Sequence, residues 1–285
     1  MIDLLRRRLE SYAVADAWRE EQALREILQE VALYGLWRAG FFEVAAFQGG
    51  TSLRLFHGLR RFSEDLDFIL IDADAGFDWS RYFGVLVDVL AEFGVHCELV
   101  DRGRMDRAVR QAMLKDDSIA RQLDLSFYRG DTGRKLKVKL EVDTCPPAGS
   151  GFEYSYLDFP LDFEVCLQDP PSNFALKIHA LLCRPYLKGR DWFDFAWYVA
   201  RGVKPNLSHL AAAIDQSGPW REAGVRVDEA WLESSLIARI RAIDWTVAAQ
   251  DVEPFLAVPE QAGLKLWSER FFTGKVAKLV LSLGA

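Results

Sequence analysis

Residues 45–69, AFQGGTSLRLFHGLRRFSEDLDFIL, contain the stretch that decides the fold of this chain. Two short apolar runs in it have the length of buried strands, and Gly49 and Gly50 end the first run. Asp65 and Asp67 alternate with apolar residues at the start of the second run. Because residues i and i+2 of a strand point to the same face, the two carboxylates are expected side by side.

The acid pair indicates a cation site. Two carboxylates at this spacing either raise each other's pKa or recruit a cation. Their hard oxygen atoms favour Mg²⁺ or Mn²⁺, with a substrate phosphate completing the coordination. We therefore predict that Asp65 and Asp67 are metal ligands. An Asp-x-Asp pair also occurs by chance on protein surfaces, and glycosyltransferases use one, so the pair alone does not define the reaction.

The glycines that precede the acid pair indicate a phosphate site. A strand, then Gly49 and Gly50, then a helix start capped by Thr51 or Ser52 would bring free backbone N–H groups and the positive end of a helix to one point. Glycine also lets the backbone approach a ligand closely. The alternative is a tight turn before a capped helix, but the acid pair on the next strand favours a phosphate site.

A third carboxylate is predicted from a later segment. Residues 119–143 alternate between apolar and polar residues as a β-hairpin does. Glu141 lies on the polar face of the second arm and is predicted to point at the same site from an adjacent strand, with Asp143 as the alternate candidate. The other interpretation is a solvated strand face, which these acids share with Lys135, Lys137 and Lys139.

Hydrophobic periodicity predicts an α/β domain over residues 1–170 and a helical domain over residues 171–285. In the first domain we expect helices at 16–39, 52–57, 80–93 and 104–114, and strands at 44–47, 66–71 and 96–100, before the hairpin. In the second domain we expect helices at 172–184, 190–201, 206–215, 228–248 and 260–282.

The first helix of the second domain is mostly apolar, but Asn173, Lys177 and Arg184 share one polar stripe. This stripe either faces water or lets Lys177 point its ammonium at a triphosphate. Asp191 and Asp194 share a face of the next helix. Asp191 is predicted to pair with Lys177 or an arginine and fix its position, whereas Asp194 is expected to make a structural ion pair.

Composition narrows the class of protein. With 50% hydrophobic and 27% charged residues in 285 positions, the chain is expected to be an ordered globular protein. The formal net charge of −7 argues against a general nucleic-acid coat, although basic residues cluster locally. Neither a membrane span nor a signal peptide is expected, and the widely spaced cysteines favour reduced thiols. We therefore expect a cytoplasmic protein.

The order of these motifs resembles a known group of enzymes. GGTSLR and R-x-S-x-D-x-D, followed by a third carboxylate on a later strand, are similar to motifs of the polymerase-β-type nucleotidyltransferase superfamily. Residues 172–199, SNFALKIHALLCRPYLKGRDWFDFAWYV, resemble the lysine helix and RDxxD segment of the AbiEii/MenT family. Residues 244–256 and 267–272 also resemble the C-terminal part of that family. The resemblance covers most of the chain.

This resemblance implies a polymerase-β-like α/β (α+β) domain with a mixed sheet, followed by a helical domain. It further implies the toxin half of a type IV toxin–antitoxin or abortive-infection system, with a cognate antitoxin as partner. Family members transfer nucleotides from an NTP, in characterised cases to the 3′ ends of tRNA. Asp is also common at the position of Glu141, which leaves the choice between Glu141 and Asp143 open.

On this basis we predict two-metal nucleotidyl transfer with Mg²⁺ or Mn²⁺. The metal ligands are expected to be Asp65, Asp67 and Glu141, and the triphosphate contacts Gly49, Gly50, Thr51, Ser52, Arg54 and Ser63. Lys177, positioned by Asp191, would offset charge on the departing pyrophosphate. The RNA is expected to follow basic residues near the site, namely Lys135, Lys137, Lys139, Arg104, Arg107 and Arg110.

Three alternatives stay open at this point. The same site would serve a small-molecule nucleotidyltransferase of the antibiotic-modifying kind. A catalytically silent module that binds a protein or RNA partner is a second alternative, although the intact acid pair and lysine argue against it. A phosphotransferase is the third, because Ser63 beside the acids could itself receive phosphate.

Overall fold

The computed structural model describes residues 1–12, 14–102, 108–116, 118, 119, 123, 125 and 136–284. The chain divides into two compact units. Unit 1 comprises residues 1–57, 62–146 and 153–167, and unit 2 comprises residues 58–61, 147–152 and 168–285. Two short segments that precede residue 168 therefore belong to the second unit, so a single boundary near residue 170 does not describe the division.

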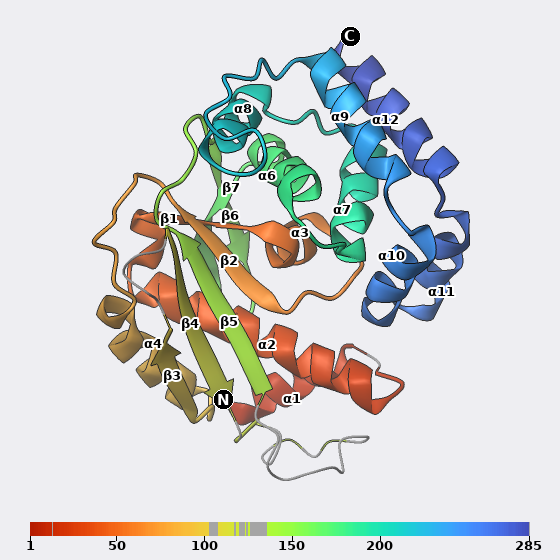
Figure 1. Ribbon diagram of the computed structural model, residues 1–285. Helices are drawn as coiled ribbons and strands as arrows, with labels where there is room; N and C mark the ends of the chain where they lie inside the picture. Colours follow the sequence, from red (N-terminus) through yellow and green to blue (C-terminus); the bar gives the residue numbers. More distant parts are fainter. Residues whose placement is uncertain are drawn as a thin grey trace. The chain divides into compact units, whose positions relative to one another are not determined.

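Unit 1 is built on a seven-stranded mixed sheet with the order β3-β4-β5-β2-β1-β7-β6 (Figure 1). β2 pairs antiparallel with β1 and parallel with β5, and β4 pairs antiparallel with β3 and β5. The strands are β1 Ala45–Gln48, β2 Asp65–Leu70, β3 Cys97–Asp101, β4 Val109–Asp116, β5 Leu136–Asp143, β6 Phe152–Leu157 and β7 Phe163–Gln168.

Helices cover one face of this sheet. Side chains of β5 alternate between buried Leu136, Val138, Leu140 and Val142 and the more exposed polar residues between them. The long helix α2, which Asp16 caps through the backbone N–H of Arg19, packs against β5 and α4. The helices of unit 1 are α1 Ile2–Glu10, α2 Ala17–Arg38, α3 Gly49–His57 and α4 Ser80–Glu92, with a 3-10 turn at Phe41–Glu43.

Unit 2 is helical among the residues that the structure describes. Its aromatic core includes Trp192, which contacts Phe272 edge to face at 5.3 Å between ring centroids, while Trp245 stacks on Phe272 at 4.2 Å. The main helices are α6 Pro170–Cys183, α7 Gly189–Ala200, α8 Leu207–Gln216, α9 Glu229–Arg241, α10 Trp245–Val252, α11 Val258–Gln261 and α12 Glu269–Leu283; 3-10 turns lie at Glu253–Phe255 and Ala262–Leu266. Across the described part of the chain, no helix is both long and apolar enough to cross a membrane.

Two predictions for the region before β5 were wrong. The helix expected over residues 104–114 is replaced, over its described part, by strand β4, and residues 103–107 lie outside the described residues. The hairpin partner of β5 is β4, since Gln111 is registered with Glu141, and not the segment that begins at residue 119. Strands β6 and β7 were not predicted at all.

Candidate active site

The register of three strands gathers the predicted carboxylates on one face of the sheet. Asp67 is paired with Gln48 of β1 on one side and with Glu141 of β5 on the other. Asp65 lies opposite Lys139, two residues earlier in the same parallel pairing. Neighbouring strands are about 4.8 Å apart, so Asp65, Asp67 and Glu141 lie together as neighbours on this face. Asp143 is registered with Ile69, two residues further along the strands than the pair of Asp67 and Glu141.

A lysine lies among these acids. Lys139 Nζ is 2.8 Å from Glu141 Oε1, and the same carboxylate oxygen accepts a hydrogen bond from Gln111 Nε2 at 2.5 Å. Burial alone would lower the pKa of Lys139, but the carboxylates of Glu141, Asp65 and Asp67 outweigh burial and raise it. Lys139 was predicted as an RNA contact, whereas the structure gives it the position of an internal counter-ion for the acid cluster.

The donor set fits a hard divalent cation that keeps several waters. Two carboxylates of β2 share one partly exposed face, and Mg²⁺ in proteins commonly takes one or two carboxylates plus water and substrate phosphates. Among the described residues, no three acidic, histidine or cysteine side chains converge closely enough to hold a metal alone. Asp65 and Asp67 are therefore the stronger candidates, and Glu141 would first have to exchange its contact with Lys139.

The glycine turn packs directly against the acid pair. Strand β1 ends at Gln48 and helix α3 begins at the next residue, Gly49, whose φ is +78°. A Cβ atom on Gly49 would lie 2.7 Å from Oδ2 of Asp67 and 3.1 Å from its Cβ. Glycine is required here both for the left-handed backbone and for the close approach to the carboxylate.

The prediction that Thr51 or Ser52 caps this helix was wrong. Because α3 begins at Gly49, both residues lie inside its first turn. The Thr51 hydroxyl donates to the carbonyl oxygen of Asp65, which fastens α3 to β2. Ser52 is fully buried, and its hydroxyl has no hydrogen-bond partner among the described residues. In the first turn of α3, a phosphate would therefore be contacted mainly by backbone N–H groups.

The other predicted triphosphate ligands have different surroundings. The Arg54 guanidinium forms an ion pair with Glu26 and lies 4.0 Å from the ring centroid of Phe62. The carbonyl oxygen of Ser63 accepts a hydrogen bond from Gln29 Nε2 at 3.2 Å. Arg54 is thus committed to a carboxylate of α2, while Ser63 is tied to the same helix through its backbone.

Replacing Gly49 by alanine is expected to destabilise the protein and to weaken metal binding, because the new methyl group meets the Asp67 carboxylate. The left-handed backbone alone costs roughly 1–2 kcal/mol for a residue with a Cβ. Gly202→Ala is the matched control, since Gly202 has φ +70° and a Cβ added there would meet no atom within 4 Å. Urea unfolding and Mg²⁺ titration of both variants test this; equal losses would mean that the contact with Asp67 is unimportant.

The basic residues predicted to bind RNA do not form one strip among the described residues. Arg110 is 4% exposed and donates from Nη2 to the carbonyl oxygen of Ala75, so it is a structural residue. Lys137 is exposed, on the same side of β5 as Glu141. Arg104, Arg107 and Lys135 lie outside the described residues.

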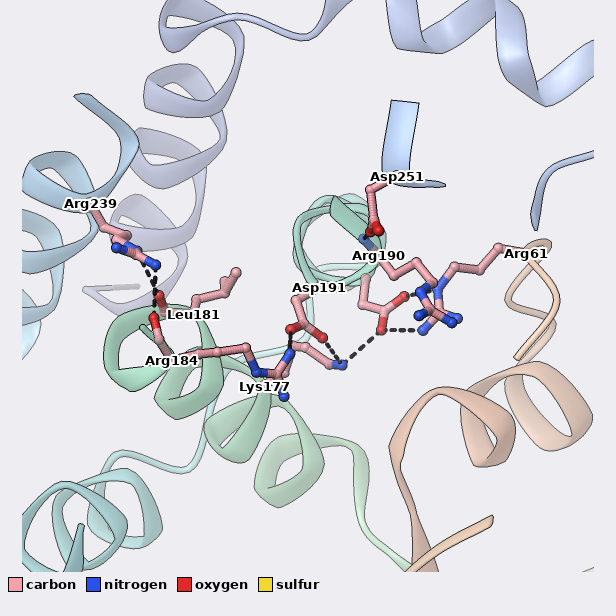
Figure 2. A network of polar contacts seen from close by, with 9 residues as sticks. Arg61, Lys177, Leu181, Arg184, Arg190, Asp191, Arg239 and Asp251 are labelled. Carbon is pink, nitrogen blue, oxygen red and sulfur yellow. Dashed lines mark hydrogen bonds and ion pairs between the residues drawn. The ribbon is translucent and has the colours of Figure 1, made fainter. Parts of the chain in front are cut away.

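In unit 2, the predicted lysine is the centre of a buried ion network (Figure 2). Lys177 Nζ lies 2.8 Å from Asp191 Oδ1 and 2.9 Å from Asp194 Oδ2. Arg184 forms an ion pair with the second oxygen of Asp191. Arg61 binds Asp194 through two hydrogen bonds of 2.6 Å. The interpretation that Lys177 faces water was wrong, and its pairing with Asp191 is present.

Arg61 was missed as a partner in this network. No local pattern in the sequence connects Arg61 with its partner Asp194, because the two residues are 133 positions apart. Its side chain is 4% exposed and that of Asp194 is fully buried. The two residues form a bidentate, buried ion pair of the kind that fixes guanidinium geometry.

Neighbouring charges lower the pKa of the buried acids in the network. Burial alone would raise the pKa of Asp191, but Lys177 and Arg184 outweigh it and lower the pKa to about 2. Asp194 follows the same pattern: burial raises its pKa, and Arg61 and Lys177 lower it below its ordinary value. In the folded protein, both groups hold their charge at lower pH than they would in the unfolded chain.

This pKa shift predicts an acid limb in the pH profile of stability, that is, a fall in the free energy of unfolding at low pH. The folded-state pKa of Asp191 is depressed, so its contribution of about 2 kcal/mol is complete above the ordinary value of 3.8 and is lost as pH falls towards 2. Lys177→Met removes one cation that lowers this pKa, so the loss should begin at higher pH. Urea unfolding between about pH 2.5 and 7 measures this, with exposed Lys204→Met as the control. An unchanged acid limb would contradict the coupling.

On one face of a mixed sheet, two aspartates of β2 lie beside a glutamate of β5 and against the glycine turn, an arrangement compatible with a nucleotidyltransferase. The comparison with protein families makes this more specific. The family described as "Nucleotidyl transferase AbiEii toxin, Type IV TA system" matches residues 31–265. The chain belongs to this AbiEii family of nucleotidyltransferase toxins.

Two solved structures from Helicobacter pylori are similar to this chain along most of its length. JHP933 is 16% identical with a TM-score of 0.49, over 93% of this chain and 91% of that chain. A protein described as a candidate nucleotidyltransferase is 16% identical with a TM-score of 0.48, over 91% of this chain and 92% of that chain. None of the curated proteins gives a significant match.

Family membership has three immediate consequences. The chain is an enzyme of the nucleotidyltransferase type, and its substrates include a nucleotide. Enzymes of this type generally use divalent metal ions, in agreement with the oxygen donors of β2. A type IV toxin–antitoxin family also implies an antitoxin partner.

Proposed function

We propose that this protein is a Mg²⁺-dependent toxin that transfers a nucleoside monophosphate from an NTP to the 3′ end of an RNA, with tRNA as the acceptor, and thereby inhibits translation. Mn²⁺ would serve in place of Mg²⁺. The observation that carries the proposal is the set of Asp65, Asp67 and Glu141 on one sheet face, against the turn at Gly49. Hard oxygen donors beside the backbone N–H groups of a helix start suit a metal-bound triphosphate.

In the proposed reaction, the 3′-hydroxyl oxygen of the RNA attacks the α-phosphorus of the NTP. A new P–O bond forms as the bond from the α-phosphorus to the bridging oxygen breaks, and pyrophosphate leaves. Asp65, Asp67 and Glu141 would hold the divalent ion, which neutralises phosphate charge and stabilises the attacking and leaving oxygens when bound. Glu141 would also accept the hydroxyl proton, once Lys139 has moved away from it.

The remaining predicted residues keep their assignments as predictions. The backbone of residues 49–52, together with Ser63, would contact the triphosphate. Arg54 and Lys177 would offset charge on the departing pyrophosphate, and Asp191 would position Lys177. Since Arg54 is paired with Glu26 and Lys177 with two aspartates, each would contact a phosphate only by sharing its charge with those carboxylates.

The open face of β4 and β5 offers a path for RNA beside the acids. Lys115 of β4 is registered opposite Lys137 of β5. The pair of Gln111 and Glu141 lies four residues away on the same two strands. Lys115 is also 3.5 Å from Glu98 of β3. Two lysines side by side on these strands would hold a phosphate backbone by charge alone.

Replacing Lys115 and Lys137 by glutamate is expected to raise the KM for RNA. The slope of log KM against the logarithm of the salt concentration should fall by about two. The KM for the NTP should change little, because the turn at Gly49 adjoins β1, which lies on the opposite side of β2 from β5 and β4. Transfer measured against RNA concentration at several salt concentrations tests this. Equal salt slopes in the wild type and the double variant would exclude this path.

The proposed function is tested directly by incubation of the protein with total RNA and each of the four α-labelled NTPs, with Mg²⁺ and with EDTA. We expect Mg²⁺-dependent label in bands of tRNA size and none with the Asp65→Asn variant. A parallel reaction with aminoglycosides and one with γ-labelled ATP complete the design. Label on an aminoglycoside but not on RNA would overturn the acceptor class. Label from γ-labelled ATP on Ser63 would indicate a phosphotransferase.

A further inference from the structure

Two neighbouring hollows of unit 2 share one side chain, Arg239 of α9. The first lies between the end of α6 and the start of α7, where Arg184, Lys188 and Asp191 also line it. Its volume is about 10 Å³, enough for a group the size of one water molecule or one phosphate oxygen. The second has a volume of about 370 Å³ and is lined in part by Trp220. Pockets of this second size commonly hold small organic groups.

Positive charge is in excess around the first hollow. Asp191 is the acid in its lining, and it is already paired with Lys177 and Arg184 (Figure 2). The Lys188 ammonium makes no hydrogen bond or ion pair with any described residue. Burial lowers the pKa of Lys188, and the charges of Lys177, Arg190 and Arg184 lower it further against the opposing effect of Asp191. An anion at this point would relieve the repulsion between these cations.

Arg239 carries charge into both hollows from a fixed position. Its Nε donates to the carbonyl oxygen of Leu181 at 3.1 Å, and its Nη2 donates to that of Arg184 at 2.9 Å (Figure 2). No carboxylate among the described residues pairs with it. The guanidinium is therefore held by two backbone oxygens and by no carboxylate of the described residues, and these two hydrogen bonds leave Nη1 to donate to a ligand.

The second hollow has the side chains that stacking of a nucleobase requires. Trp220 is partly exposed and is held edge to face against Trp231, with ring centroids 5.4 Å apart and an interplanar angle of 75°. Ser234 and Ser235 of α9 add hydroxyl groups to the lining. An aromatic side chain next to a cationic point is the common arrangement for stacking a base of a single strand while its phosphate is held nearby.

We propose that the two hollows bind one nucleotide of a single-stranded RNA, with a backbone phosphate on Arg184, Lys188 and Arg239 and the base against Trp220. The inference rests on the proposed function in taking the occupant to be the acceptor RNA. A phosphodiester suits the first hollow, because one of its non-bridging oxygens matches the volume of the hollow. The site would hold a nucleotide of the acceptor by its phosphate and by stacking, without reading its sequence.

Direct binding tests this inference without any catalysis. The probe is a fluorescein-labelled, single-stranded RNA of eight nucleotides, titrated with the full chain in EDTA and followed by anisotropy. Lys188→Gln is expected to weaken binding about 5-fold and to reduce the salt slope by about one. Trp220→Ala is expected to weaken it about 10-fold, whereas Trp220→Phe keeps an aromatic face and should recover most of the affinity. Lys204→Gln, at an exposed lysine of the same unit, should bind as the wild type does.

The outcomes separate this site from the proposed function. Wild-type RNA affinity in both Lys188→Gln and Trp220→Ala, with unchanged thermal unfolding, would overturn the site even if RNA is labelled in the transfer assay. Displacement of the RNA by ATP or inorganic phosphate at low concentration would also overturn it, because the hollows would then prefer a free anion. RNA binding that depends on both residues, without any transfer to RNA, would support the site and contradict the proposed function.

Discussion

Replacement of Asp67 by asparagine is expected to reduce nucleotidyl transfer by roughly 10³-fold, at the upper end of what the loss of one charge-stabilising group costs. The fold should be unaffected, since asparagine has nearly the same shape beside Gly49 and since the loss of one charge relieves repulsion with Asp65. Transfer at saturating Mg²⁺ and urea unfolding of the same preparation are the two measurements. Asp65→Asn should behave in the same way.

Asp143→Asn is the matched control, because Asp143 lies on the same face of β5 but is registered with Ile69 and not with Asp67. Its Oδ1 accepts a hydrogen bond from the backbone N–H of Cys145, which asparagine can also accept. We expect near-normal transfer from this variant and a large loss from Glu141→Gln. The reverse result would make Asp143 the third carboxylate. Wild-type transfer by Asp67→Asn would remove the acid pair from the active site.

The largest effect on stability is expected from Asp194→Ala. Asp194 is fully buried and neutralises both Arg61 and Lys177. Truncation leaves these buried cations with one carboxylate fewer, which typically costs about 3–5 kcal/mol. The free energy of unfolding from urea titration at pH 7 measures the loss.

Arg241→Ala supplies the comparison, since Arg241 pairs with Glu269 at 3.7 Å with a side chain that is 70% exposed. An exposed pair of this kind contributes under about 1 kcal/mol. A loss of that small size from Asp194→Ala would show that the network around Lys177 adapts to the missing carboxylate. The double variant Arg61→Leu with Asp194→Leu should be less destabilised than Asp194→Ala, because it leaves no buried arginine without its acid.

Local patterns predicted the acid cluster well. The alternation in residues 65–71 placed Asp65 and Asp67 on one face of β2, and the alternation in β5 placed Glu141 on its polar face. Both strands lie with one face on the helices, so the period of two is visible in the sequence. The register that pairs Glu141, and not Asp143, with Asp67 is contained in no local pattern.

The failures share a physical cause, namely polar side chains that are buried in the folded protein. In β4, Arg110 and Asp116 are buried alongside Ala112 and Leu114, so the strand lacks the apolar alternation that would reveal it. Asp116 is satisfied locally by the N–H groups of Ser118 and Ile119. Lys177 was given a water-facing alternative for the same reason, because only the folded unit brings it between two aspartates.

The buried pair of Arg61 and Asp194 has a consequence for how the chain is made. The ribosome adds Asp194 133 residues after Arg61, so the arginine is synthesised long before the aspartate that neutralises it. During that interval the nascent chain carries the arginine without its partner, and unit 2 cannot finish folding until its own C-terminal part has been synthesised. Arg61 precedes residue 168, so a fragment that begins at residue 168 lacks it. Truncation of the gene at one point therefore cannot yield a complete unit 2.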